Sequence, residues 1–552
     1  MRASLRLALS TALALLASAL LINCCSAAPE KEDRMTHRWL FVWRSMHNPA
    51  EVDRMIARFP RAQAAGYNAC VFPFDVAPSK AEELKAAATR YGLDLIPVVM
   101  SGSRDQNYTE GVPSREALFV AKGGVLVFQP DNPTRIANGD FERVTGDGFD
   151  GWQMQTEEGT PLVADHEVVH GGKTSVRVEP NGKHCVLTQS VRLQPFRQYR
   201  ASIWAKSEGL RAHREAVGIG IVDAKTERRI TYQNTGVRPN QDWKLHTISF
   251  NSLESTEATF SVGVHWWEGG GRLWLDDFAV EEMGLVNVVR RPGCPVTIKG
   301  EDGTEYEEGR DYEPIVDPHL QIVEAYHEPP VVRLTPGTRI EEGERLRISY
   351  YHPVVIYDFK TTSCLSEPKR FEEWQAQIKQ VNDLLHPAAF FMDFDEIRVA
   401  NWCALCQSRH LTPGELLADT TRRAVKIIRD LRPDAPIWVW SDMYDPMANG
   451  VEHYYFCNGP MTGAWKGLEP SIGVINWAGE MLGANSPFFA ERGHKQILSG
   501  YYDGDEDGAT ITQWIEKTKG VPGVVGAMYT TWQDKYDAME VWAEKAWGGK
   551  AK

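Results

Sequence analysis

The sequence predicts an α/β protein built on an eight-stranded (β/α)8 barrel, interrupted after its third strand by all-β structure. Apolar runs typical of buried strands alternate with helical segments before residue 101 and again after residue 365. Residues between 101 and 353 instead show short alternating runs, many turn residues and few helix signals. Three strands before this interruption and five after it make the strand count of a (β/α)8 barrel, whose active site forms at the carboxyl ends of the strands.

The first part of the barrel is expected between residues 36 and 103. Asn48 is a helix N-cap followed by Pro49, which favours the first helical turn, and Pro60 is expected to kink or end this helix. A capping box formed by Ser79 and Glu82 is expected to open a second helix. The three expected strands cover residues 39–43, 68–74 and 93–100.

The second part of the barrel is expected between residues 354 and 549. Helices are expected over residues 367–385, from the capping box of Thr412 and Glu415, and over residues 537–547. The five expected strands cover residues 388–392, 436–441, 472–477, 496–502 and 524–532.

The interruption divides into a β-sandwich over residues 132–283 and a small β-subdomain over residues 284–353. The first carries a succession of motifs that resembles the CenC-type carbohydrate-binding modules: residues 138–142 (NGDFE), 151–152 (GW), 175–178 (SVRV), 199–205 (YRASIWA) and 273–278 (LWLDDF). The resemblance implies a jelly-roll sandwich that binds glycan and a structural calcium for which Asp277 is a candidate ligand. The alternative is a sandwich that serves only as a spacer. The small β-subdomain shows no chemical signature.

The segment Asp393-Phe394-Asp395-Glu396 is the first candidate for chemistry. It follows the buried apolar run of residues 388–392, so its acids stand where a barrel strand ends. Like charges at close range raise one another's pKa, which is unfavourable for stability but useful for placing one carboxylic acid and one carboxylate at a reacting centre.

An Asp-Glu pair at the end of the fourth strand resembles the family 20 glycoside hydrolases, the β-N-acetylhexosaminidases. The resemblance implies that Glu396 is the general acid and that Asp395 orients the 2-acetamido group of the substrate, whose carbonyl oxygen attacks the anomeric carbon. The His-x-Gly-Gly that usually precedes this pair is missing here. Because neighbouring residues of a regular strand point to opposite faces, the strand must break at Asp395; otherwise Asp393 and Asp395 share a face. The alternative is an ion-pair network of these acids with Arg398 and Arg409.

Aromatic and polar residues at the other strand ends are candidates for substrate binding. Aromatic walls suit an acetamido-sugar pocket, and hydroxyl and carboxylate groups suit sugar hydroxyls. Each candidate could equally pack inside the barrel. The candidates are Arg44, Trp440, Asp442, Trp477, Tyr502, Tyr529 and Trp532.

Composition favours an exported protein that handles carbohydrate. The net charge of −14 and the lack of a basic run argue against nucleic acid as a partner, and 18 Trp, 18 Tyr and 20 Phe favour an oligosaccharide, polysaccharide or glycoconjugate partner. Residues 1–28 have the basic start and short apolar stretch of an export signal. The protein is therefore expected to be periplasmic, at the cell surface or secreted, and to meet a membrane only through a lipid anchor at Cys24 or Cys25.

Cys403 and Cys406 form a single CxxC just beyond the acidic segment. A zinc site would need a second pair of cysteines or histidines at ligand spacing, which does not accompany it. In an exported protein a disulfide between these two residues is the expected state.

The sequence thus predicts an exported glycoside hydrolase that cleaves β-linked N-acetylhexosamine by substrate-assisted acid catalysis, with no required cofactor. One alternative is a retaining glycosidase that acts on a sugar without an acetamido group and uses Asp442 or Glu480 as nucleophile. The other is a non-catalytic, glycan-binding lipoprotein of the cell surface.

Overall fold

The computed structural model describes residues 35–102, 108–131, 133–156, 162–179, 184–211, 216–265, 270–321, 325–357, 360–477 and 479–548. The expected export signal, with Cys24 and Cys25, lies outside these residues. Among them, no helix is both long enough and apolar enough to cross a membrane. The chain forms two compact units, one of residues Met1–Ile96 with Gly473–Lys552 and one of Pro97–Ile472.

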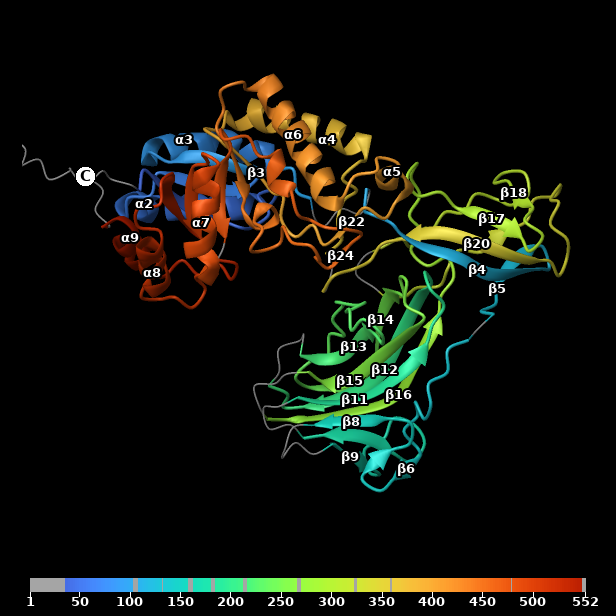
Figure 1. The fold of residues 1–552 in the computed structure, drawn as a ribbon. Coiled ribbons are helices and arrows are strands. Elements are labelled where there is room, and N and C mark those ends of the chain that lie inside the picture. The colour runs from blue at the N-terminus through green and yellow to red at the C-terminus, as the bar shows by residue number, and fades with distance from the viewer. Residues whose placement is uncertain are drawn as a thin grey trace, which may run out of the picture. The chain divides into compact units, whose positions relative to one another are not determined.

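Eight strands close into a parallel barrel (Figure 1). Each lies where the sequence predicts a barrel strand, so the strand count and order are confirmed. In the unit that holds both chain ends, the first strand pairs with the last, Trp39 opposite Met528. The strands, in barrel order, are β1 (His37–Phe41), β2 (Ala69–Pro73), β3 (Asp94–Val99), β21 (Phe390–Met392), β23 (Ile437–Trp440), β25 (Gly473–Trp477), β26 (Gln496–Ser499) and β27 (Val524–Tyr529).

The helices of the first unit confirm one expected cap and correct two other predictions. Asn48 caps α2 (Pro49–Ala64) by accepting a hydrogen bond from the Ala50 N–H. Pro60 does not end α2, because the buried face of the helix continues on both sides of it, through Phe59 and Ala62. The expected capping box at Ser79 is absent: a short 3-10 helix, η1 (Pro78–Lys80), precedes α3 (Ala81–Tyr91), which has no side-chain cap. The remaining helices here are η4 (Gly479–Met481), α7 (Leu482–Glu491), α8 (Ala509–Lys517) and α9 (Met539–Trp547).

In the second unit, the helices that flank β21 and β23 begin where the sequence predicts. Glu367 caps α4 (Pro368–Leu385). Thr412 and Glu415 form both hydrogen bonds of the capping box that opens α6 (Pro413–Leu431). Shorter elements are β22 (Val399–Ala400), α5 (Ala404–Gln407), η2 (Asp442–Tyr444), β24 (Phe456–Cys457) and η3 (Ala464–Gly467), and β22 pairs with β24.

A β-sandwich occupies the middle of the second unit. One sheet has the order β14-β12-β16-β10-β9 and the other β13-β15-β11-β8, and a single apolar core that includes Phe141, Trp152 and Phe278 lies between them. The strands are β8 (Gln153–Thr156), β9 (Leu162–Asp165), β10 (Ser175–Val178), β11 (Cys185–Arg192), β12 (Gln198–Glu208), β13 (Val217–Asp223), β14 (Gln241–Asn251), β15 (Glu257–Val264) and β16 (Arg272–Glu282), with the hairpin β6 (Val144–Thr145) and β7 (Gly148–Phe149) beside β8.

The small β-subdomain is discontinuous in sequence. Its six-stranded sheet has the order β18-β17-β20-β4-β5-β19, and two of its strands precede the sandwich. The range expected for this subdomain, residues 284–353, is therefore too narrow. Its central pair of strands, β4 and β20, lies on either side of the sandwich in the sequence. The strands are β4 (Val112–Lys122), β5 (Val125–Phe128), β17 (Thr297–Gly300), β18 (Glu305–Tyr306), β19 (Val332–Arg333) and β20 (Arg345–His352).

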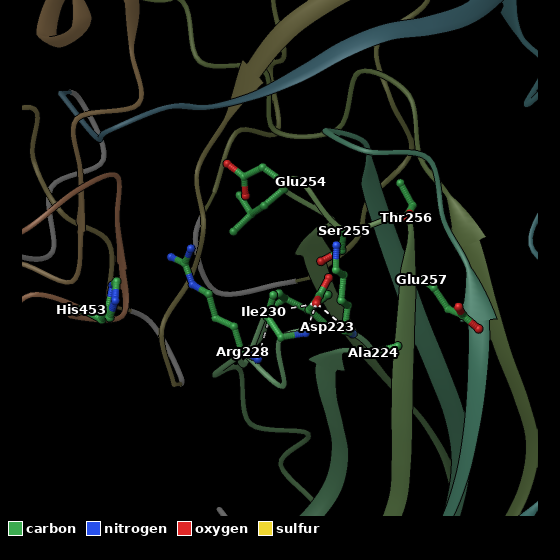
Figure 2. A pocket seen from close by; sticks show the side chains of 12 residues that line it. Asp223, Ala224, Arg228, Ile230, Glu254, Ser255, Thr256, Glu257 and His453 are labelled. Carbon is green, nitrogen blue, oxygen red and sulfur yellow. Dashed lines mark hydrogen bonds between the residues drawn. The ribbon is translucent and has the colours of Figure 1, made fainter.

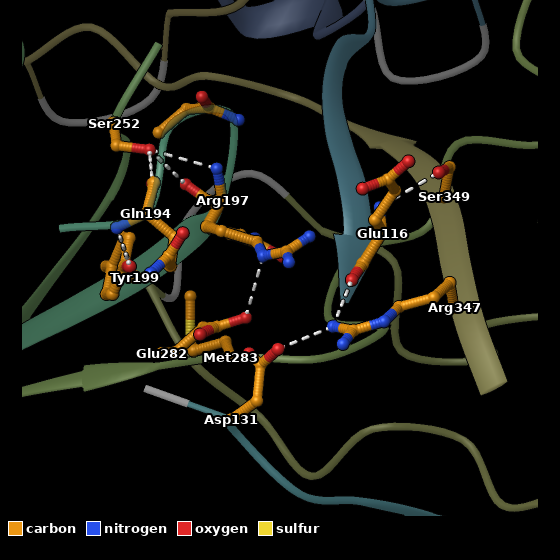
Figure 3. A network of polar contacts seen from close by, with 12 residues as sticks. Glu116, Asp131, Gln194, Arg197, Tyr199, Ser252, Glu282, Met283, Arg347 and Ser349 are labelled. Carbon is orange, nitrogen blue, oxygen red and sulfur yellow. Dashed lines mark hydrogen bonds and ion pairs between the residues drawn. The ribbon is translucent and has the colours of Figure 1, made fainter. Parts of the chain in front are cut away.

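Two ion pairs lie where the sandwich strands meet the six-stranded sheet (Figure 3). Arg197 pairs with Glu282 at 3.2 Å, and both side chains are almost completely buried. Arg347 of β20 pairs with Asp131 at 2.6 Å. Burial raises the pKa of Glu282 to about 7. Loss of Arg197 would leave this buried carboxyl group without its ion-pair partner, which would destabilise the fold.

Candidate active site and carbohydrate-binding domain

The acidic segment begins directly where barrel strand β21 stops. The Asp393 N–H still donates to the Val99 carbonyl of β3 at 2.8 Å, but Glu396 has a φ of +52°, a conformation outside the extended region. The strand alternation is thus broken, as the Asp395-Glu396 assignment requires. Phe394 and Ile397 turn inward and are fully buried, whereas Asp395 and Glu396 are partly exposed.

Asp395 forms a carboxyl pair with Asp442 of η2. The two carboxyl groups lie close enough for the Asp395 charge to act on Asp442, and the buried Asp442 Oδ1 accepts no hydrogen bond from a donor group of the described residues. Asp442 is buried, and the Asn449 side-chain amide donates to its Oδ2 at 2.7 Å. Burial, followed by repulsion from Glu396, raises the pKa of Asp395 to about 6. Burial and the Asp395 charge raise the pKa of Asp442 well above its usual range. β21 and β23 are neighbouring parallel strands, so this pair is built at their carboxyl ends.

Glu396 is held by two cations instead. Its Oε1 accepts from Arg398 at 2.7 Å, and its Oε2 pairs with Lys360. The Arg398 guanidinium lies 5.1 Å from the Tyr357 ring and 4.9 Å from the Tyr455 ring, within the range of cation–π attraction. This part of the site is the ion-pair network that the sequence offered as an alternative.

The other cation of that alternative network lies elsewhere. Arg409 pairs with Asp419 at 2.9 Å and does not contribute to the acidic segment.

Four further residues of this site were not predicted: Tyr357, Lys360, Asn449 and Tyr455. They come from irregular segments far from residue 395 in the sequence, where local periodicity carries no information. The aromatic pair Tyr454-Tyr455 was the one available signal.

Trp440, expected as a substrate wall in this unit, packs inside the barrel. It is 5% exposed, and its ring centroid lies 4.8 Å from that of Phe391. Asp442, expected to bind sugar directly, instead lies behind Asp395 as its carboxyl partner.

In the other unit, two of the expected wall residues form an aromatic cluster. Trp532 lies 6.1 Å from Trp477 and 5.8 Å from Trp43, ring centroid to ring centroid, and all three are partly exposed. The Asp503 carboxylate fixes the Trp532 backbone by accepting its N–H at 2.7 Å. Such a cluster can present aromatic faces to a sugar.

The remaining expected binding residues of that unit have structural roles. Tyr502 and Tyr529 are 2% and 1% exposed and stack on one another, so they are core residues. Arg44 donates to the Trp43 carbonyl at 2.9 Å and lies 3.9 Å from Asp534.

Asp277, the expected calcium ligand, is engaged by another side chain. Its Oδ2 lies 2.6 Å from His170 Nδ1, and the neighbouring Asp276 accepts from the backbone N–H groups of His170 and Gly171. No third carboxylate joins these two in the described part of the sandwich. A calcium ion prefers six to eight oxygen ligands, and these residues do not fit it.

A platform of aromatic rings lies on one sheet of the sandwich. The His170 ring stacks on Trp204 of β12 at 3.8 Å and lies edge-on to Trp243 of β14 at 5.7 Å. All three rings are partly exposed, as a surface that stacks on sugar faces requires.

A separate hollow of about 910 Å³ lies by the β13–β15 end of the sandwich (Figure 2). Asp223 is one of its lining residues. Its carboxylate already accepts hydrogen bonds from the backbone N–H groups of Lys225 and Thr226 and from the Thr226 hydroxyl. His453 supplies the only ring among the lining side chains of the described residues. We therefore place the candidate glycan platform at Trp204 and not in this hollow.

Residues 135–268 match the family model of a carbohydrate binding domain. This segment of the chain is similar to a carbohydrate-binding domain. It comprises most of the sandwich, so the predicted β-sandwich is confirmed and the predicted glycan binding is supported. A comparison with curated proteins finds no match.

Solved structures that resemble the chain each cover less than a third of it. One is TmCBM61 in complex with β-1,4-galactotriose (20% identity, 27% of this chain and 97% of that chain, TM-score 0.21). Another is the CBM22-1 xylan-binding domain of Xyn10C from Paenibacillus barcinonensis (14% identity, 29% and 97%, TM-score 0.20). A third is the enzymatically active domain of tailspike protein 4 of bacteriophage CBA120 (14% identity, 27% and 21%, TM-score 0.21), of which this chain therefore spans about a fifth.

Proposed function

We propose that the protein is an exported glycoside hydrolase whose barrel cleaves a glycan that the carbohydrate-binding domain holds. One observation carries this proposal: a partly exposed carboxyl group, Asp395, is paired with a buried one, Asp442, at the carboxyl ends of neighbouring barrel strands. The alternation of the eight parallel strands with helices supports a (β/α)8 barrel, in which this end of the strands carries the active site.

In this proposal Asp395 is the general acid. A glycosidic oxygen leaves as an alcohol only if it receives a proton as its bond to the anomeric carbon breaks. A pKa of about 6 keeps part of Asp395 protonated near neutral pH, and its partial exposure lets it reach a substrate. Asp442 is a positioning residue, because its buried side chain acts on the substrate only through Asp395.

Glu396 has a different role in this proposal from the one that the family 20 resemblance implies. Both of its oxygens already engage cations, Arg398 and Lys360, so we assign it to holding those side chains beside Asp395. The substrate class that the resemblance suggests is kept: a β-linked N-acetylhexosamine, whose acetamido oxygen attacks the anomeric carbon as Asp395 protonates the leaving oxygen. Water then opens the resulting ring and returns a proton to Asp395.

The test is hydrolysis of aryl β-glycosides by the wild type and by the variants Asp395→Asn and Glu396→Gln. The panel pairs N-acetylglucosaminides and N-acetylgalactosaminides with sugars lacking the acetamido group, each with a good and a poor leaving group. We expect Asp395→Asn to lower kcat/KM by about 10²-fold or more for the poor leaving group and less for the good one, because only the poor one depends on protonation. Asp419→Asn, which removes an ion pair outside the site, is the matched control and should leave kcat/KM unchanged.

The same panel gives outcomes that contradict the assignment. If Glu396→Gln shows the leaving-group dependence and Asp395→Asn does not, Glu396 is the acid. Cleavage restricted to sugars without the acetamido group would favour a two-carboxylate mechanism with an enzymic nucleophile. The pH profile of kcat/KM is a further check: activity that rises through pH 6 instead of falling would show that Asp395 acts as a carboxylate.

A non-catalytic glycan-binding protein is the second candidate function. The clamp of Arg398 and Lys360 on Glu396 favours it, because a fixed ion pair is a structural feature that a binding protein can retain without chemistry. Retention on immobilised glycan by a wild type that cleaves no member of the panel would establish this function.

A further inference from the structure

A cluster of buried thiols lies outside the acidic site. The structure brings together cysteines from three separate segments of the second unit, and it adds one buried carboxylate from a fourth. All of these cysteines are free, so the disulfide expected between Cys403 and Cys406 is not formed. The members of the cluster are Glu110, Cys294, Cys364, Cys403 and Cys406.

The spacing of three of these sulfurs matches a metal site. Cys364 Sγ lies 3.6 Å from Cys403 Sγ and 3.5 Å from Cys406 Sγ. Sulfurs at a Zn–S distance of about 2.3 Å in a tetrahedron lie about 3.8 Å apart, whereas disulfide sulfurs lie about 2.05 Å apart. The Cys406 backbone N–H also donates to Cys403 Sγ at 3.5 Å, which would stabilise a thiolate there.

Cys294 supplies a fourth sulfur. It lies beside Cys403 but outside the group of Glu110, Cys364, Cys403 and Cys406, whose ligand atoms all lie within 4.8 Å of one another, so binding as a fourth ligand requires its turn to move inward. That turn is joined to the CxxC loop by the Ala404 N–H, which donates to the Gly293 carbonyl at 2.9 Å. Gly111 leaves room for this sulfur, because a Cβ at that position would lie 2.8 Å from Cys294 Sγ.

Glu110 is already occupied by other groups. Its Oε1 accepts the N–H groups of Trp402 and Cys403, each at 2.7 Å. Its Oε2 lies 3.5 Å from Arg291 and 3.8 Å from Cys406 Sγ. A carboxylate fixed in this way orients the segment that carries Cys403. Residues that hydrogen-bond to the ligands of a metal commonly have this role.

We propose that Cys294, Cys364, Cys403 and Cys406 bind one Zn²⁺ ion in a closed tetrahedral site, with Glu110 outside the direct ligands. Binding converts the four thiols to thiolates and releases their protons, and the resulting complex carries two negative charges. Arg291 lies close enough to Cys294, Cys364 and Cys403 to offset part of this charge. Four protein ligands leave no open position for substrate, so the site is structural.

The proposed zinc site does not depend on the proposed hydrolase activity. It joins the CxxC loop, which follows the acidic segment and β22, to the turn at Cys294 and to the segment that leads into α4. Loss of the metal is therefore expected to destabilise the loops around the barrel end whether or not the barrel is catalytic.

The first test is the zinc content of the purified full chain, measured by elemental mass spectrometry. We expect one zinc per chain in the wild type and loss of zinc in Cys364→Ser and Cys406→Ser. Cys70→Ser removes a buried free cysteine of β2 outside the cluster and should keep one zinc. Circular dichroism reports whether each variant is folded.

A second test begins with the intact ligand set of the wild type, so its first result does not depend on the folding of a cysteine variant. We expect the wild type, after exchange of zinc for Co²⁺, to show an intense thiolate-to-cobalt charge-transfer band. Cys294→Ser should weaken that band, and Glu110→Gln should not. The reverse result would replace Cys294 by Glu110 as the fourth ligand and overturn the four-thiolate assignment. A chain that takes up neither zinc nor cobalt under reducing conditions would overturn the site itself, as would disulfides among these cysteines in the native protein.

Discussion

At the residue scale, two neighbouring acids have opposite surroundings. Asp395 meets a second carboxyl group, and Glu396 meets two cations. The positive φ of Glu396 separates them, because it turns the chain where a regular strand would have continued. Two carboxyl groups that are neighbours in the sequence can therefore have different protonation states, because their surroundings in the fold differ.

The buried carboxyl of Asp442 makes stability depend on pH. Its folded-state pKa is raised well above the unfolded value of about 3.9. Between about pH 4 and its folded pKa, Asp442 is protonated in the folded state and ionised in the unfolded state, so the folded state binds more protons. The free energy of unfolding therefore decreases as the pH rises through this range. We expect Asp442→Asn to have a higher Tm than the wild type at pH 8, by roughly 1 to 3 °C, and no such gain at pH 4.

Thermal unfolding from pH 4 to pH 8 checks this prediction. Asp419→Asn, which lies in a partly exposed ion pair, should show no comparable dependence on pH. A constant difference in Tm between Asp442→Asn and the wild type at every pH would contradict the assignment of a buried, protonated carboxyl group.

The sequence predicted the position of Asp395 and Glu396 and offered Arg398 as a partner, but it did not predict the contacts with Asp442 and Lys360. A buried apolar run followed by acids identifies a strand end, and that information is local. The contacts of Asp395 with Asp442, and of Glu396 with Lys360, depend on how distant loops return to the strand end. The same limit applies to Trp440 and Tyr502, since an aromatic residue at a strand end can face either the barrel core or the opening.

At the element scale, the carbohydrate-binding domain depends on one close backbone approach. The Phe278 N–H of β16 donates to the Gly139 carbonyl at 2.7 Å, and a Cβ at residue 139 would overlap the Phe278 carbonyl oxygen. We expect Gly139→Ala to destabilise this domain by about 2 kcal/mol or more, because a backbone atom cannot move aside without breaking the sheet.

Denaturant unfolding followed by Trp fluorescence measures this effect, together with retention on immobilised glycan. Gly337→Ala is the control, because nothing lies within 4 Å of a Cβ built at that position. Equal stability of the two variants would show that the Gly139 segment is not packed as described.

Helix ends were predicted best where a polar side chain defines them. Thr412 and Glu415 form a complete capping box, and Asn48 caps α2, because these hydrogen bonds involve residues within three positions. Pro60 was expected to kink or end α2 and does not end it, since the packing of Phe59 and Ala62 outweighs one missing backbone hydrogen bond. Such tertiary packing is not visible in a local pattern.

At the scale of the whole molecule, the sandwich has its own core but also contacts the loops beside the acidic segment: Leu253 packs with Trp402, and the Tyr232 ring lies 4.5 Å from that of Tyr455. The sandwich has its own apolar cluster, and the six-stranded sheet has another. We expect replacement of residues 133–283 by a short Gly-Ser linker to lower retention on polymeric glycan at least tenfold, because the second point of attachment is lost. Cleavage of small aryl glycosides should fall less but should not stay unchanged, because Tyr455, which lies against Arg398, loses its contact with Tyr232.

Affinity electrophoresis in glycan-containing gels, with the aryl-glycoside assay beside it, measures both effects. A deletion that abolishes both activities while the remaining chain stays folded would show that the sandwich contributes directly to the reaction.

The pairing of β4 with β20 has a consequence for how the chain folds. These strands place Val112 opposite His352, so the two ends of a very long insertion emerge side by side. Without that pairing, closing the barrel between β3 and β21 would carry the entropic penalty of a loop of about 290 residues, roughly 2 kcal/mol more than a loop of about 30 residues. Once the pairing has formed, the third and fourth barrel strands are joined by what is in effect a short connection. The inserted part is thus expected to fold before the barrel closes, because the ribosome releases the first three strands long before β21 and β27, which pair with β3 and β1, are made.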